Sequence, residues 1–476
     1  MAGDPNILKE LQGIVGEEQA TSDKHIMYAY SYDMSFVKNK LPAYVVLPEN
    51  AEEVQQIVKL ANKTKTPLIP YVAGTNIGGL CIPEKDNSIV MDLKRMNRII
   101  RIDEDSRYAI IEPGVSHAQL AEELYKRGLR FGWPVGPPSA SVLACAICHG
   151  IGGITGRYGL NSEQITSMEV VRPTGEVARV GSCAIQEDSW HSLLPLPLLN
   201  GLFTGWLGTT GVVTKIGIFT PAIPPEVEIV TTATDTLQDM YKYMLQMGRY
   251  EIADDLTAVS WWLSQVPIPY PYKEKPKDAP EWNSYAVLYA YTPKELEAKL
   301  EMFEQTVKDQ QKAGSSLQVT QYPEEARRAR TELPSQIVGS TKNYSKEAGG
   351  GISWPGTFTP ANRWVDVWEK WRDIYTKRNL SPSVRVTMYR GTHYGMLRAM
   401  TPLNKQYPDQ VENARMAIVE ALQVLLDNGG IPYKPPVDFW KEIFDRADPG
   451  FVQLIQDVKD FIDPNNIMNP GKLLYR

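Results

Sequence analysis

The sequence predicts an α+β protein built from two domains and a C-terminal segment. Up to about residue 220, short apolar runs alternate with amphipathic helical patterns, which is typical of open sheets covered by helices. At residues 221–225 (PAIPP) the composition changes, and longer helical patterns follow. A chain of 476 residues is also long enough for two or three cores. We therefore predict a first domain over 1–222, a second over 223–430 and a final segment over 431–476.

In the first domain, apolar spacing and turn residues place most elements. We expect helices at 5–20, 51–64 and 118–127, strands at 44–48, 67–72 and 88–93, and strand pairs at 99–102 with 108–112 and at 168–172 with 177–180. The turn between the last pair is marked by Pro173 and Gly175.

The second domain combines longer helices with strands. Helical patterns cover 237–247, 293–313, 362–378 and 411–428, and strand-like runs cover 285–291 and 383–388. The helices are amphipathic, so we interpret their apolar stripes as core. This part is therefore a second α+β domain.

Composition excludes several classes of protein. A net charge of −6 argues against a nucleic-acid binder, and four cysteines are too few for a disulfide scaffold of this size. The longest apolar region, residues 193–219, is interrupted by prolines, glycines and Lys215, so we expect no membrane span. The N-terminus has no apolar signal core, which predicts a cytoplasmic protein.

Two glycine-rich stretches are the candidates for ligand binding. Residues 131–159 are rich in glycine near both ends, and residues 73–79 (AGTNIGG) follow an apolar strand. Glycine allows the backbone to approach a flat or charged ligand with its N–H groups free. Small polar residues directly after a strand suit a phosphate, whereas the alternative is a plain loop-rich connection.

These stretches carry a resemblance to a known family. The order PxxAGTxxxG, IxRIDxxxRxAxIEPGV, PSASVLACAICHGIGG, MEVVRPTGEV and LFTGWLGTTGVVTK is similar to the FAD-binding domain of the vanillyl-alcohol oxidase and p-cresol methylhydroxylase superfamily. The tail DPNNIMNPGK resembles the C-terminal signature of that family. The resemblance implies a p-cresol methylhydroxylase-type FAD domain, a substrate cap at 223–430 and a final segment that returns to the FAD domain.

The resemblance also implies a set of cofactor contacts, with Gly74, Thr75 and Asn76 around the pyrophosphate. The full set that we expect to bind FAD is Val72, Ala73, Gly74, Thr75, Asn76, Ile77, Gly78, Pro137, Ser141, Val142, Cys145, Gly152, Gly211, Val213 and Lys472.

The run Cys145 to His149 reads formally as CxxCH, the c-type haem attachment signature. Haem is disfavoured because the motif lies inside the flavin segment and the chain shows no export signal. A redox disulfide is disfavoured because an odd spacing in a strand would put the thiols on opposite faces. By the resemblance, Cys148 takes the place of an aspartate that acts on the substrate, and His149 that of an arginine. His149 either serves as an acid–base group or packs without titrating.

Three stretches of the cap and the final segment resemble substrate-facing motifs. Gly351 stands where family members carry a histidine that bonds to the flavin, so we expect non-covalent FAD. Arg390 and His393 resemble a run that faces the substrate, or else serve an ion pair. Tyr433 and Lys434 resemble a tyrosine–arginine pair that binds a phenolate, with lysine in place of the guanidinium, or else form a plain connection.

The predicted function is transfer of a hydride from an aromatic substrate, a 4-alkylphenol or benzylic alcohol, to FAD. The alternatives are a 2-hydroxy-acid dehydrogenase of the glycolate or D-lactate type, whose GHxGDGNxH and EHG runs are absent here, and an electron-transferring flavin subunit. The resemblance implies an electron-acceptor protein, a cytochrome, iron–sulfur protein or electron-transfer flavoprotein. We expect a homo-oligomer and no metal site.

Overall fold

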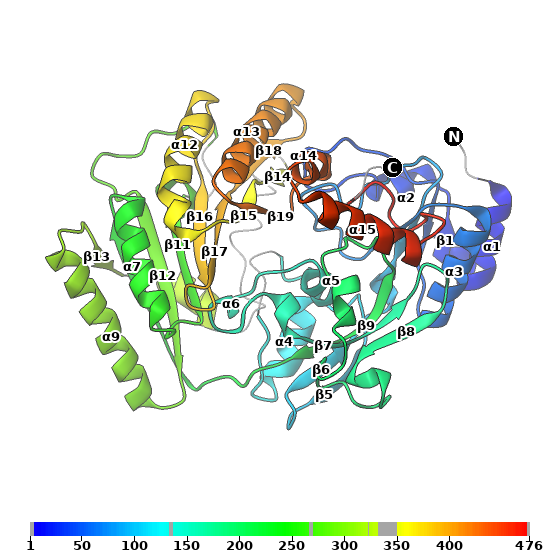
Figure 1. Ribbon diagram of the computed structural model, residues 1–476, viewed down its shortest axis with the longest axis horizontal. Coiled ribbons are helices and arrows are strands. Elements are labelled where there is room, and N and C mark those ends of the chain that lie inside the picture. The colour runs from blue at the N-terminus through cyan, green and yellow to red at the C-terminus, as the bar shows by residue number, and fades with distance from the viewer. Residues whose placement is uncertain (1–3, 133–136, 266–269, 322, 332–349, 474–476) are drawn as a thin grey trace.

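The computed structural model describes residues 4–132, 137–265, 270–321, 323–331 and 350–473 (Figure 1). Residues 133–136 of the long glycine-rich stretch and Gly349 lie outside the described residues. The mixture of helices and sheets confirms the predicted α+β class. No helix in the described ranges has the length and apolar character needed to cross a membrane.

The N-terminal part contains two sheets. The first has the order β1-β2-β4-β3 and the second the order β5-β6-β9-β7-β8. Their strands are β1 (Ala20–Thr21), β2 (Tyr44–Val46), β4 (Ile89–Asp92) and β3 (Leu68–Tyr71), then β5 (Ile99–Asp103), β6 (Tyr108–Ile111), β9 (Val212–Phe219), β7 (Ile165–Val171) and β8 (Val177–Gly181). The helices are α1 (Pro5–Val15), α2 (Lys24–Ala29), α3 (Ala51–Thr64), α4 (His117–Tyr125), α5 (Val142–Ile147) and α6 (Thr155–Tyr158).

Local sequence explains why these elements form. In α3, the Asn50 side chain caps the first turn by accepting a hydrogen bond from the Glu53 amide. The apolar face of α3, including Val54, Ile57 and Val58, is fully buried against the first sheet. In that sheet β2, β4 and β3 are parallel, so they all end at the same edge, where the chain leaves β3 into residues 72–79.

The cap is an eight-stranded antiparallel sheet covered on one face by helices. The strand order is β13 (Gln318–Thr320), β10 (Glu226–Thr234), β12 (Trp282–Ala290), β11 (Asp255–Ser260), β16 (Val384–Tyr389), β17 (Tyr394–Ala399), β15 (Gly356–Phe358) and β19 (Ile431–Tyr433). The helices are α7 (Leu237–Arg249), α8 (Trp261–Ser264), α9 (Pro293–Lys312), α10 (Glu324–Thr331), α12 (Trp364–Lys377) and α13 (Pro408–Asp427). Figure 1 shows α7, α9, α12 and α13 on the side of the sheet that faces away from the N-terminal part.

A large aromatic core holds the cap helices to their sheet. Trp282 of β12 and Trp364 and Trp371 of α12 are completely buried there. The sheet ends with β19, which pairs with β15. The cap sheet therefore extends three residues past the predicted boundary at 430. A separate pair, β14 (Gly350–Ser353) and β18 (Thr401–Asn404), lies beside it.

The uncovered face of the cap sheet meets the N-terminal part. Arg130 and Asp254 form a nearly fully buried ion pair, with 2.6 Å between Arg130 Nη2 and Asp254 Oδ2. Glu163 accepts a hydrogen bond from the Tyr394 hydroxyl at 2.6 Å and pairs with Arg390 Nε at 3.0 Å. The last helices, α14 (Trp440–Asp445) and α15 (Pro449–Ile462), return to the N-terminal part (Figure 1). These contacts fix the cap above the loops that follow β3 and α5.

Candidate active site

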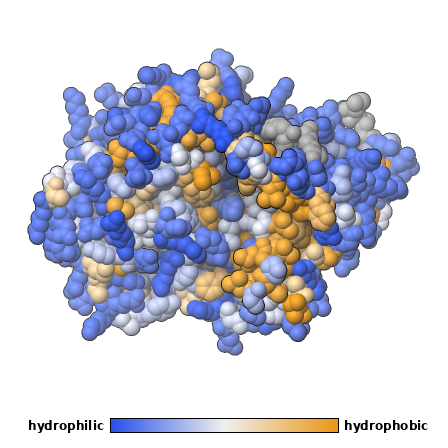
Figure 2. Space-filling view, viewed as in Figure 1, coloured by the Kyte–Doolittle hydropathy of each residue, from blue (hydrophilic) through white to orange (hydrophobic). Residues whose placement is uncertain are grey.

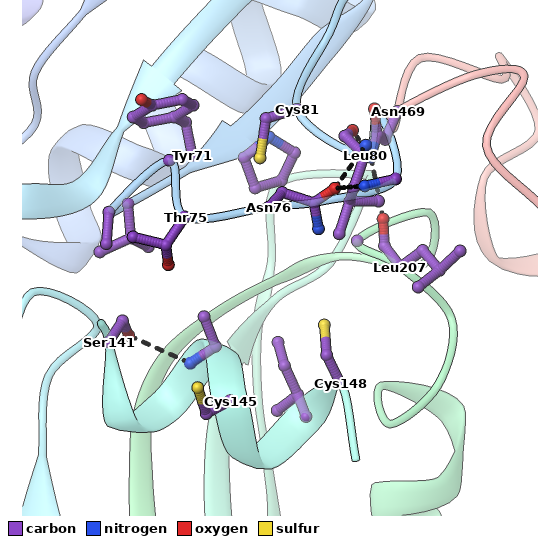
Figure 3. A pocket seen from close by; sticks show the side chains of 18 of the residues that line it. Tyr71, Thr75, Asn76, Leu80, Cys81, Ser141, Cys145, Cys148, Leu207 and Asn469 are labelled. Carbon is purple, nitrogen blue, oxygen red and sulfur yellow. Dashed lines mark hydrogen bonds between the residues drawn. The ribbon is translucent and has the colours of Figure 1, made fainter. Parts of the chain in front are cut away.

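A long cavity lies between the loop after β3 and the helix α5. It encloses about 1210 Å³ when the part open to solvent is included. Figure 3 shows the loop with Tyr71, Thr75, Asn76 and Cys81 on one side and α5 with Ser141, Cys145 and Cys148 on the other. The wall is completed by residues 207–213, residues 434–440 in part, and Asn469.

The loop after β3 offers a row of backbone donors. Among the described residues, no acceptor is found for the amide nitrogens of residues 73–77. The loop is held from behind, since the Asn76 side chain accepts hydrogen bonds from the Gly78 and Leu80 amides at 2.9 and 3.1 Å. Asp33 accepts from the Gly79 amide at 2.7 Å. Consecutive unused N–H groups after a strand form an anion-binding concavity suited to a pyrophosphate.

Two further polar atoms in the cavity wall lack partners. The Oδ1 atom of Asn469 and the Nε1 atom of Trp440 are buried, and neither has a hydrogen-bond partner within the described part of the chain. The amide group of Asn469 is fixed, because Nδ2 donates to the Leu207 carbonyl at 2.8 Å. Buried polar groups are normally paired, so these atoms mark places where a ligand supplies the missing partner. The cavity fits a long ligand with phosphate and heterocyclic groups, as FAD has.

Gly74 is required by both the turn and its neighbour. Its φ is +64°, and a Cβ atom built on it would lie 2.0 Å from the Tyr71 hydroxyl. A larger residue at this position would therefore displace the Tyr71 side chain.

Most of the predicted cofactor contacts line this cavity. These are Val72, Ala73, Gly74, Thr75, Asn76, Ile77, Gly78, Ser141, Cys145, Gly211 and Val213. Four predicted contacts lie outside the cavity wall, namely Pro137, Val142, Gly152 and Lys472. Val142, the first residue of α5, is buried in the core, and Gly152 packs against the Gly132 backbone. The Lys472 ammonium is buried behind the loop, where it donates to the Gly79 carbonyl at 2.9 Å and to Glu84 at 2.7 Å.

The two cysteines of the CxxC run lie at a helix, and not in the strand that was expected when a disulfide between them was disfavoured. Cys145 is in α5, and Cys148 follows as its C-terminal cap. Residues three apart share a helix face, so both thiols line the cavity. Burial raises the pKa of each thiol, partly offset by the charge of Lys434, so both are neutral at pH 7. All four cysteines are free.

His149 faces away from the cavity. Its Nδ1 is 2.9 Å from the Ser162 hydroxyl, and its Nε2 occupies the space beside Gly205 where a side chain would stand. Burial, helped by the charge of Lys434, lowers the pKa of His149, so the ring is neutral near pH 7. This geometry favours the packing interpretation of His149 over the acid–base one.

Lys434 and Tyr433 connect the cavity to the cap. Lys434 lines the cavity, and its Nζ lies 5.1 Å from the centre of the Tyr433 ring. Burial acts to lower the pKa of Lys434, whereas negative charge on Tyr433, Cys145 or Cys148 would raise it. The Lys434 side chain is half-buried.

An aromatic cluster adjoins this cation on the cap sheet. Phe358 contacts the rings of Tyr433, Tyr394 and Tyr389, with centroid distances of 5.3, 5.6 and 6.4 Å. The Tyr389 hydroxyl contacts Met396 Sδ at 3.8 Å. Tyr389 and Tyr394 are the ends of the run that resembles a substrate-facing motif, whereas the sequence did not single out Phe358, which looks like an ordinary strand residue until β15 pairs with β17.

Arg390 and His393 lie in the exposed turn between β16 and β17 and do not line the cavity. Arg390 is 51% exposed and pairs with Glu163 of the N-terminal part. The ion pair considered as the alternative for Arg390 is thus present, but it spans the two parts of the molecule. No cluster of three or more possible metal ligands occurs among the residues that the structure describes.

The chain is similar to known flavoproteins in both sequence and fold. The model of an FAD binding domain matches residues 42–181, and that of the C-terminal domain of FAD-linked oxidases matches residues 437–473. The flavoprotein subunit of 4-cresol dehydrogenase (hydroxylating) from Pseudomonas putida is 24% identical over 98% of this chain and 94% of its own length. A D-2-hydroxyglutarate dehydrogenase from Stutzerimonas stutzeri is 23% identical over 99% of both chains. The crystal structure of p-cresol methylhydroxylase with substrate bound superposes with a TM-score of 0.85 at 21% identity, covering 98% of this chain and 96% of that one.

Proposed function

We propose that this chain, an FAD-dependent oxidoreductase similar to members of the p-cresol methylhydroxylase and vanillyl-alcohol oxidase superfamily, oxidises an aromatic substrate. The substrate class is a 4-alkylphenol or a benzylic alcohol, and the electrons leave to a separate acceptor protein. FAD, when bound, supplies the hydride acceptor. The residues of the chain bind the substrate, orient it and stabilise its charge.

The observation that carries the proposal is the position of Lys434. It lines the cofactor cavity, lies against the Tyr433 ring and adjoins the aromatic cluster around Phe358. A half-buried lysine ammonium beside a tyrosine stabilises the phenolate form of a phenol, whose pKa falls next to a positive charge. The flat aromatic rings provide contact area for the substrate ring.

The cofactor is held by the cavity residues described above. The free amides of residues 73–77 suit the pyrophosphate, and Asn469 and Trp440 offer polar partners further along the wall. We propose non-covalent binding. By the resemblance, Gly351 stands where family members carry a flavin-tethering histidine; glycine has no nucleophile, and a Cβ there would lie 2.3 Å from Leu403.

A second candidate is oxidation of a 2-hydroxy acid. The full-length similarity to a D-2-hydroxyglutarate dehydrogenase favours it, and Lys434 could hold a carboxylate as well as a phenolate. A third candidate is an electron-transferring subunit that oxidises no substrate itself. An assay of the purified chain for substrate oxidation distinguishes it from the first two. An acceptor protein is supported by the similarity to the flavoprotein subunit of 4-cresol dehydrogenase.

Two substitutions test the substrate site. In Lys434→Met and Tyr433→Phe we expect normal flavin content and a rate of flavin reduction by substrate that is lower by roughly 10- to 100-fold. This follows from losing a charge-assisted hydrogen bond of about 1.5–3 kcal/mol. Lys441→Met, which removes a lysine that is 70% exposed on α14, is the matched control. Unchanged stopped-flow rates in both site variants would contradict the assignment.

A further inference from the structure

A row of side chains crosses the cap sheet beside Tyr433. In β15, Gly356 is the register partner of Tyr433 in β19 and of Arg398 in β17. Arg398 is in turn the register partner of Arg385 in β16. Register partners project from the same face of an antiparallel sheet. Two arginines therefore lie next to each other, and only a glycine separates them from the tyrosine of the proposed substrate site.

Both arginines point toward the N-terminal part. The residues that flank them in their strands belong to the core under the cap helices; these are Val384, Val386, Leu397 and Ala399. Because successive residues of a strand face opposite sides, the arginines lie on the uncovered face. They are buried there, with Arg385 9% and Arg398 5% exposed. The outer surface of the cap, on the left in Figure 2, is by contrast largely hydrophilic, and arginine is usually found on such a surface.

Arg385 belongs to a polar network at the far end of the row from Tyr433. Its Nε donates to the Thr387 hydroxyl at 3.1 Å, and its Nη2 donates to the hydroxyls of Thr257 at 3.1 Å and Tyr285 at 3.4 Å. The same two hydroxyls donate to the Asp255 carboxylate, at 2.7 and 3.3 Å. These contacts fix Arg385 in position behind Arg398.

Arg398 lies closer to Tyr433 and stacks on an indole. Its guanidinium lies 4.6 Å from the centre of the Trp354 ring. A Cβ atom built on Gly356 would be 3.0 Å from Trp354 Cδ1, so the indole covers the glycine of the row. Trp354 also packs against the cluster that contains Ile77, a residue of the cofactor cavity wall. The stack therefore lies between the cap sheet and the loop after β3.

Trp354 adds a hydrogen-bond donor to this place. Its Nε1 atom is buried, and no acceptor for it occurs in the part of the chain that the structure describes. Buried donors are normally paired, so this N–H marks a position for an oxygen atom of a ligand. Next to it, the guanidinium of Arg398 carries N–H donors in a planar fork that matches a carboxylate. Like charges on neighbouring strands repel, and a bound anion offsets that repulsion between Arg398 and Arg385.

We propose that Arg398 and Trp354 form a subsite for a carboxylate, so that the substrate is a phenol with an acidic side chain. This inference rests on the proposed function, in which Tyr433 and Lys434 take the phenol oxygen. Strands of a sheet lie about 4.8 Å apart, so the backbones of Tyr433 and Arg398, on either side of β15, are about 10 Å apart. One aromatic ring with a short acidic chain spans the distance between their side chains. The substrate is thus held at both ends.

The test compares 3-(4-hydroxyphenyl)propanoate with its primary amide, which has nearly the same shape but no charge. Titration calorimetry uses the holoprotein with its flavin chemically reduced under anaerobic conditions, so that binding is measured without oxidation of the ligand. We expect the wild type to bind the acid more tightly by about 10-fold or more, as for a charge-assisted hydrogen bond. In Arg398→Met this preference should disappear, while the affinity for the amide stays the same.

Two further variants complete the test. Trp354→Phe keeps a ring beside the guanidinium but removes the N–H, so it should weaken binding of the acid alone. Arg415→Met is the matched control, because this arginine is 42% exposed on α13, and it should keep the full preference for the acid. Bound flavin and circular dichroism show that each variant is folded.

The comparison within the wild type needs no variant. Equal affinities of the wild type for the acid and the amide would overturn the inference, and so would a preference for the acid that Arg398→Met retains. The proposed function is judged by a separate observation, the bleaching of oxidised flavin. If neither the acid, the amide nor 4-ethylphenol bleaches it, the proposed function fails. If all three bleach it but the acid binds no better than the amide, only the carboxylate subsite is wrong.

Discussion

The imidazole of His117, at the start of α4, is buried in the interior. It is 3% exposed and stacks near Phe131 at 6.0 Å, and no hydrogen bond to its Nε2 occurs among the described residues. Burial, followed by the charge of Lys434, lowers the pKa of His117 to about 3. This residue therefore stays neutral in the folded protein at pH values where it is charged in the unfolded chain.

A pH-dependent stability follows from His117. Between about pH 6.5 and pH 3 the unfolded chain binds a proton at this residue and the folded chain does not, so acid favours unfolding. The free energy of unfolding should fall by about 1.4 kcal/mol per pH unit on this account. In His117→Leu that part of the slope should disappear. Urea unfolding from pH 4.5 to pH 7 measures the difference, and equal slopes for the two proteins would refute it.

Single residues could be predicted from the sequence where their chemistry is local. The donors after β3 follow from the pattern AGTNIGG directly after an apolar run, and residues 72–78 all line the cavity. Lys472 and Asn469 show what the sequence alone could not predict. Both belong to the tail DPNNIMNPGK, but only the fold decides that Asn469 reaches the cavity while Lys472 lies behind the loop.

At the scale of elements, helices with a regular apolar spacing were predictable and short apolar runs were not. Residues 51–64 form α3 as expected, because the period and the Asn50 cap agree. The six residues of α5 are too few to show a helical period, so the sequence did not distinguish this helix from a strand. The pairing of β15 with β17 and β19, which assembles the aromatic cluster, joins residues far apart in the sequence.

The buried ion pair between Arg130 and Asp254 joins the cap to the N-terminal part. Its side chains are only 4% and 2% exposed, and the Arg130 guanidinium also lies 4.1 Å from the Tyr289 ring centre. Removing the carboxylate leaves a buried charge without its partner, so Asp254→Asn should cost about 3–5 kcal/mol of stability. Arg390→Gln breaks an exposed pair across the same boundary and should cost less than about 1 kcal/mol. Similar losses in chemical unfolding of the two variants would show that this pair does not secure the cap.

For the whole molecule, we expect FAD to be bound without a covalent bond to the chain. Gly351 sits in β14 opposite Leu403 of β18, with no space for a side chain that could bond to the flavin. Acid precipitation should therefore release all of the flavin into the supernatant. A yellow, fluorescent pellet would mean that another residue forms a covalent bond to it.

The central claim is that Lys434, Tyr433 and the aromatic cluster bind a phenol beside FAD. Its most direct test is anaerobic mixing of the purified holoprotein with single substrates while the visible absorbance of the oxidised flavin is followed. We predict rapid bleaching by a 4-alkylphenol or an aromatic alcohol and none by glycolate, D-lactate or D-2-hydroxyglutarate. Bleaching by a 2-hydroxy acid alone, or by none of these compounds, would contradict the account.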